Sequence, residues 1–167
     1  MSSTTAGRDW GMLRHVVATI AYRGGKTLRG APPDFGTFAI GEKTRTPVQI
    51  LAHIGDLLEW TLRLAQGQQE WRAAWRAAAP LTWSAETDRF FASLSALDEF
   101  LASGAPLRFP AEKLFQGPLS DALTHVGQIA MLRRLAGSPV KGEVMIRADI
   151  VPGRVGPDQS APVREFD

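Results

Sequence analysis

The chain has 167 residues and a net charge of +2, from 19 basic and 17 acidic side chains. Its length is that of one ordinary domain, and 44% hydrophobic residues are enough to build a core. The small charge excess and the absence of any run of five like charges argue against a nucleic-acid-binding surface. The sequence has no cysteine, which excludes a disulfide framework, a thiolate zinc site and a cysteine nucleophile.

Two further absences bear on location. No stretch reaches the roughly 18 apolar residues that a membrane span needs. Residues 1–10 are small and polar, without the apolar segment of a signal peptide. We therefore expect a cytoplasmic protein with no membrane and no nucleic-acid partner.

Hydrophobic periodicity predicts four helices. They cover residues 9–23, 47–66, 84–103 and 118–136. Thr46 and Ser84 are good caps for the second and third helices, and Pro47 suits the first helical position. The fourth helix is apolar on almost every side, which predicts that it is the most buried. Apolar residues expected in the core include Trp10, Leu13, Val17, Ile20, Ile50, Ile54, Leu57, Leu58, Phe90, Phe91, Leu94, Leu97, Phe100 and Leu101.

The connections between these helices are less regular. Residues 24–45 read as a long loop, residues 68–79 as an extra helical turn or two, and residues 144–150 as a short strand. The default architecture is an all-α, antiparallel four-helix bundle over residues 1–140, with an extended tail over residues 141–167 packed on or near it. That tail either folds over the mouth of a site or is solvated.

Two side chains on the fourth helix have the spacing of metal ligands. Asp121 and His125 lie four residues apart, so they share one helix face and can chelate a divalent cation. The simpler alternative is a helix-dipole carboxylate beside a hydrogen-bonded histidine.

His53 favours the metal interpretation. It lies six residues after Pro47, about 9 Å into its helix at about 1.5 Å per residue. In an up-down-up-down bundle the second and fourth helices run parallel, so that His53, Asp121 and His125 reach a similar depth. A bound cation would also offset the cost of burying Asp121. His15 points away from the apolar stripe of its own helix and is predicted at the surface.

The segments TPVQILAHIGDLLEW (46–60) and LSDALTHVGQIAMLRRLAGSPV (119–140) resemble the DinB-like family. Proteins of this family are four-helix bundles, commonly dimers, with a divalent metal held by a histidine of helix two and two ligands of helix four. The resemblance covers residues 9–140 and places His53 and His125 at ligand positions, with a Gly-Gln pair soon after His125. Asp121 stands where the common pattern has a third histidine, as in the branch that contains mycothiol-dependent maleylpyruvate isomerase, where glutamate serves. The ion implied is zinc, nickel, manganese or iron.

Other side chains carry weaker signals. Gln128 either hydrogen-bonds a metal ligand or joins two helices, and Asp56 either accepts a hydrogen bond from His53 or lies on a solvated helix face. Trp60 is a candidate for lining a substrate pocket or for the core. Three more tryptophans share that choice, with a dimer interface as a further role for the first two: Trp71, Trp75 and Trp83.

Two functions of different classes follow. The first is a metal-dependent enzyme, a hydrolase or thiol-dependent transferase, in which the ion activates water or a thiol of a small-molecule substrate. The second is a metal-free bundle, most simply a homodimer, that acts as a binding or stress-response module without catalysis. No separate general base is evident, and Asp56 is only a candidate.

Overall fold

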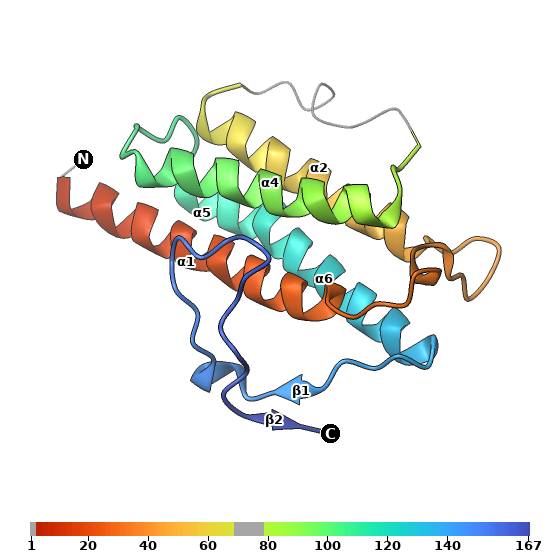
Figure 1. Cartoon of the computed structure of the whole chain (residues 1–167). Helices are drawn as coiled ribbons and strands as arrows, with labels where there is room; N and C mark the ends of the chain where they lie inside the picture. The colour runs from red at the N-terminus through yellow and green to blue at the C-terminus, as the bar shows by residue number, and fades with distance from the viewer. Residues whose placement is uncertain (1–2, 69–78) are drawn as a thin grey trace.

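A computed structural model of the chain describes residues 3–68 and 79–167, and this part is mostly helical. Figure 1 shows the long helices packed side by side, with the C-terminal segment along one flank. The long helices are α1 (Ser3–Leu28), α2 (Pro47–Ala65), α4 (Trp83–Ala102) and α6 (Ser120–Leu135). The short elements are η1 (Phe35–Thr37), α5 (Ala111–Leu114), the π-helical turn η2 (Phe115–Leu119), η3 (Met145–Arg147), β1 (Gly142–Glu143) and β2 (Glu165–Phe166). The predicted all-helical class is thereby confirmed, apart from a two-stranded antiparallel sheet of β1 and β2.

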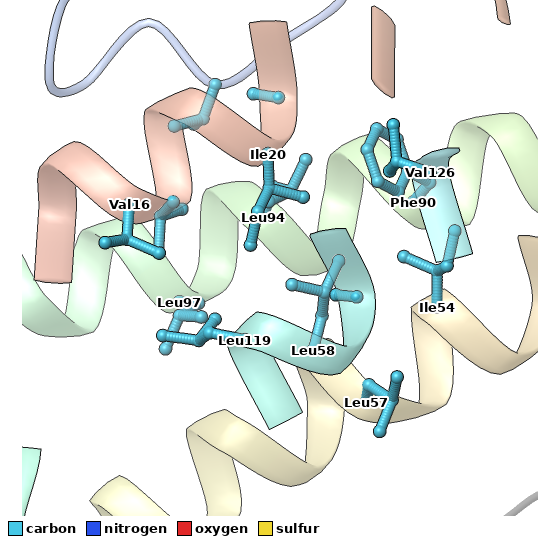
Figure 2. Close-up of a cluster of buried hydrophobic side chains, with 14 of the residues drawn as sticks. Val16, Ile20, Ile54, Leu57, Leu58, Phe90, Leu94, Leu97, Leu119 and Val126 are labelled. Atoms are coloured by element: carbon cyan, nitrogen blue, oxygen red, sulfur yellow. The ribbon is translucent and has the colours of Figure 1, made fainter. Parts of the chain in front are cut away.

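The core lies between the four long helices, because α2 packs against α4 and α6 while α1 packs against the same two. Figure 2 shows side chains from all four helices converging there. Most of the residues that the sequence placed in the core are buried: Leu13, Val17, Ile20, Ile50, Ile54, Leu57, Leu58, Phe90, Leu94, Leu97 and Leu101. The other three, Trp10, Phe91 and Phe100, are only partly buried and pack against the edge of the core. The apolar stripes of the first three helices were therefore predicted correctly. None of the described helices combines the length and apolar character that a membrane crossing needs.

Two predicted helix boundaries were wrong. Helix α1 continues to Leu28, where a loop was expected from Gly24 onward. A Cβ at Gly24 would lie 2.4 Å from Cζ of Phe90, so this glycine allows α1 and α4 to approach closely. Helix α4 is capped by Thr82 and not by Ser84, since the Thr82 hydroxyl accepts a hydrogen bond from the Ala85 amide at 3.3 Å.

The sequence predicted that the fourth long helix is the most buried one, and this was wrong: α6 is buried on one side only. Its core side carries Ala122, Val126, Ile129 and Leu132, whereas Met131 is 58% exposed. Among the long helices that the structure describes, α6 packs mainly against α1 and α2, and several of its side chains outside those contacts are exposed. The predicted extra turns over residues 68–79, with Trp71 and Trp75, lie almost wholly outside the described residues.

The C-terminal segment packs along α1 (Figure 1). The predicted strand over residues 144–150 was wrong, since the chain forms η3 there and pairs Gly142 and Glu143 with Phe166 and Glu165 instead. Glu143 fixes the segment, because its side chain is 1% exposed and accepts hydrogen bonds from Tyr22 at 2.8 Å and Lys26 at 2.9 Å.

Burial of Glu143 favours its protonated form, but the hydrogen bonds from Lys26 and Tyr22 outweigh this and hold its pKa below the ordinary value. Glu165 and Glu143 together raise the pKa of Lys26 against the effect of burial, because both accept hydrogen bonds from its ammonium group. The C-terminal segment is thus held to α1 by a buried, charged network.

This network predicts a pH-dependent contribution to stability. Glu143→Gln should lower the free energy of unfolding by about 2 kcal/mol at pH 7, the usual magnitude for a hydrogen bond to a charged group. Because the folded-state pKa is depressed, the contribution is present above the unfolded-state pKa of about 4.3 and is lost as the pH falls through the folded-state pKa. Urea unfolding of wild type and variant between pH 7 and pH 3 measures the difference. Glu99→Gln, an exposed control on α4, should change stability by less than about 0.5 kcal/mol, and equal losses in both variants would contradict the assignment.

Candidate metal centre

The helix that carries His53 and the helix that carries Asp121 and His125 run antiparallel. His53 lies opposite Asp121, Leu57 and Trp60 lie opposite Gly117, and the Arg108 amide donates to the Ala65 carbonyl. The parallel run predicted from an up-down-up-down order was therefore wrong. Figure 1 shows the reason: α4 starts at the same end of the molecule as α2, so these two helices run parallel and α6 returns in the opposite direction.

His53, Asp121 and His125 lie at the same level of the bundle, as predicted, although their helices run in opposite directions. Residues 111–135 form α5, η2 and α6 in succession, so Asp121 and His125 lie near the middle of one helical segment. His53 lies near the middle of α2, and two antiparallel segments bring their middles together. The sequence missed the short helix α5, but the break that it predicted at Gly117–Pro118 is present as a kink within η2, where Gly117 has non-helical φ −92° and ψ −105°.

The three predicted ligands form one cluster. Nε2 of His125 lies 3.4 Å from Oδ1 of Asp121, and Nε2 of His53 lies 3.8 Å from Oδ2 of the same carboxylate. The two imidazole rings meet edge to face, with centroids 4.8 Å apart. One ligand atom from each of the three residues lies within 4.8 Å of the other two.

These separations suit a shared ion. Ligand atoms at 2.0–2.1 Å from a tetrahedral ion are about 3.4 Å apart, close to the distance between His125 and Asp121. The widest separation between ligand atoms is at most 4.8 Å, which exceeds this spacing by at most about 1.4 Å, so ion binding requires a rotation of at least one histidine ring. Two imidazoles and one carboxylate are a donor set for zinc, iron, nickel or manganese, and three protein ligands leave coordination positions for other groups.

Protonation also favours ligation. The Nδ1 atom of His125 lies 2.8 Å from Oε1 of Gln128, an acceptor, so in the neutral tautomer that this contact favours Nδ1 donates and the lone pair is on Nε2. Burial lowers the pKa of His53, and the neighbouring charges of His125 and Arg45 lower it further, more than Asp121 raises it. His53 therefore stays neutral to lower pH than a free imidazole does.

A cavity of about 450 Å³ opens beside the cluster. It is lined on one side by Leu57 and Trp60 of α2 and on the other by residues from Gln116 to Thr124, including Asp121. The Asp121 side chain is 49% exposed, while the two histidines are 12% exposed. A substrate in this cavity would therefore reach a shared ion from the side of the Asp121 carboxylate. No tail residue is among the described lining residues, so the tail does not close this mouth.

Asp56 is not on a solvated face, contrary to the sequence analysis. It is 8% exposed and accepts a hydrogen bond from Arg89 at 2.9 Å. The same guanidinium donates to Glu59 and to the fully buried Glu86, and also to the Ala52 carbonyl. Burial disfavours the charged form of Arg89, but these acidic partners outweigh it and raise its pKa.

Arg89 was missed by sequence reasoning, although it fixes the turn of α2 that carries His53. The available signal was Gly55, where a Cβ would lie 2.6 Å from Cζ of Arg89. A glycine inside an otherwise well-formed helix indicates a close approach by another group. His15 is exposed as predicted, and Trp83 packs edge to face on Phe35 at 5.3 Å, away from the cluster.

The chain matches no protein-family model, no curated protein and no solved structure. The resemblance to the DinB-like family therefore depends on the two segments quoted above and on the residues within them. What the structure contributes is the convergence of His53, Asp121 and His125 beside a cavity.

The Arg89 network predicts two destabilising changes. Arg89→Met should lower the free energy of unfolding by about 3–5 kcal/mol, because buried carboxylates lose their cationic partner. Gly55→Ala should also destabilise, although alanine is the better helix former by about 1 kcal/mol, because its methyl group displaces the guanidinium. Denaturant unfolding measures both, with Arg147→Met at an exposed site as the control. A Gly55→Ala protein more stable than wild type would contradict the close approach.

Proposed function

We propose that the protein is a metal-dependent enzyme of the DinB-like type, a four-helix bundle that holds one divalent ion through His53, Asp121 and His125. The observation that carries this proposal is the cluster itself: two imidazoles beside one carboxylate, close to ligand spacing, with the carboxylate of Asp121 on the wall of a cavity. When bound, such an ion acts as a Lewis acid and lowers the pKa of a coordinated water or thiol.

The residues around the cluster have separate tasks in this proposal. Gln128 fixes the ring and tautomer of His125, and Arg89 holds the turn of α2 from which His53 projects. Trp60 and Leu57 offer an apolar wall on which the body of a small substrate rests, while Ser120 and Thr124 offer hydroxyl groups. The mixed lining suits a small, partly polar molecule, which agrees with either a hydrolase or a thiol-dependent transferase.

Metal binding is tested by thermal unfolding of chelator-treated protein with added zinc, nickel, manganese or iron(II). A ligand at 100 times its Kd stabilises a folded protein by about 2.7 kcal/mol, which for a chain of this size raises Tm by roughly 5–10 °C. We expect this rise in wild type and in His15→Ala, whose exposed imidazole is the matched control. We expect it to disappear in His53→Ala and His125→Ala. A rise that survives in both cluster variants, or no rise with any of the four metals, would support the metal-free binding module instead.

The two chemistries are separated by a spectroscopic test on cobalt(II)-substituted protein. A thiol-dependent transferase should bind a small thiol as thiolate at the metal, which adds a thiolate-to-cobalt charge-transfer band in the near ultraviolet. A hydrolase does not depend on this coordination, so absence of the band when thiol is added would contradict the transferase alternative. The His125→Ala protein is the control for adventitious cobalt–thiol complexes in solution. The sequence analysis also predicts a homodimer, and analytical ultracentrifugation would measure the mass of the protein in solution.

A further inference from the structure

A second cavity, of about 310 Å³, lies between α1, α6 and the C-terminal segment. Its lining includes Tyr22 and Lys26 from α1, Ala130 from α6, and Met145 and Phe166 from the C-terminal segment. None of its described lining residues belongs to the His53–Asp121–His125 cluster. Binding in this cavity therefore does not depend on whether the cluster holds a metal ion.

The cavity is lined by four basic side chains and one acidic side chain. Lys26 is already neutralised, because it pairs with Glu143 at 2.9 Å and with Glu165 at 2.8 Å. The other three basic residues, Arg23, Arg134 and Lys141, have no side-chain hydrogen bond or ion pair with any residue that the structure describes. All three residues are exposed, so their charges are available to an anion that enters the hollow from solvent.

The C-terminal segment supplies an apolar wall to the same cavity. The Phe166 ring lies against Gly142, where a Cβ would be 2.5 Å from the ring atom Cε2, so only glycine admits the ring in this position. Val140 and Met145 extend the wall. The segment is held in place by the buried Glu143, so the wall has a fixed position relative to the cations of α1 and α6.

We propose that this cavity binds a small organic phosphate monoester, with its phosphate between Arg23, Arg134 and Lys141 and its apolar body against Phe166. A phosphate monoester carries close to two negative charges at neutral pH and three acceptor oxygens, which match three cationic donors better than a single carboxylate does. Arginine donates two parallel hydrogen bonds to such a group. The size of the cavity suits a body of about one ring.

Phenyl phosphate is the probe that tests the proposal, by calorimetry on chelator-treated protein at pH 7.5. We expect saturable binding that is tighter than that of benzoate, which has one charge, and of inorganic phosphate, which has no apolar body. Arg134→Gln should weaken it about tenfold, the loss expected for one charge-assisted interaction. Arg147→Gln, which removes one charge at an exposed site outside the cavity, should change it less than twofold.

Two further variants separate the parts of the site. Phe166→Ala should reduce the affinity for phenyl phosphate to that for inorganic phosphate and leave the latter unchanged. His125→Ala should bind phenyl phosphate as wild type does, whatever the outcome of the metal experiments. The proposal is overturned if wild type shows no saturable binding, if Arg147→Gln weakens binding as much as Arg134→Gln, or if His125→Ala abolishes it.

Discussion

The guanidinium group of Arg89 joins α4 to α2 through several hydrogen bonds. Arg89 reaches from α4 to the carboxylates of Asp56 and Glu59 and to the Ala52 carbonyl, so it grips the helix on both sides of His53 in the chain. A backbone carbonyl in the middle of a helix is normally committed to its own ladder, and a second donor there fixes the helix against rotation as well as translation. Rotation is what matters for the cluster, because a turn of α2 about its axis would swing the His53 ring away from α6.

The facing helix meets α2 through a different device. The π-helical turn at η2 contains Gly117 and Pro118, and Leu119 directly after them is 1% exposed and lies in the core. Gly117 has non-helical dihedrals, so the chain kinks there, and the kink sets the direction in which the following turns continue. In this chain the following turns carry Asp121 and His125. The cavity beside the cluster opens along the same turn, so one irregularity supplies both the orientation of two ligands and the space next to them.

Sequence reasoning succeeded where a single periodicity determines the outcome. The buried stripes of α1, α2 and α4 follow from apolar spacing alone, and the pairing of Asp121 with His125 follows from their separation of four residues. It failed where long-range contacts decide, as at Gly24, which reads as a helix end but admits Phe90, and at Asp56, whose partner Arg89 is 33 residues away. The direction of α6 relative to α2 also lay beyond local patterns, because it depends on which connection crosses the bundle. The sequence analysis assumed that α2 and α6 run parallel, but it still placed His53 beside Asp121. A residue near the middle of its helix meets the middle of a neighbouring helix whether the two run parallel or antiparallel.

The burial of α6 was overestimated from its hydrophobic pattern, because its surface does not face the core on every side. Its surface divides into three faces: Ala122, Val126 and Ile129 toward the core, Asp121 and His125 toward α2, and Ala130 and Arg134 toward α1 and the C-terminal segment. Small residues between these faces, such as Gly127, count as apolar in a helix pattern although they lie at the rim of a polar cavity. A helix with one acidic, imidazole-bearing face and one cationic face is a wall between two hollows of opposite chemical preference. A cation on the first side and an anion on the second would each complete the charge that its own face lacks, without contacting the same side chain.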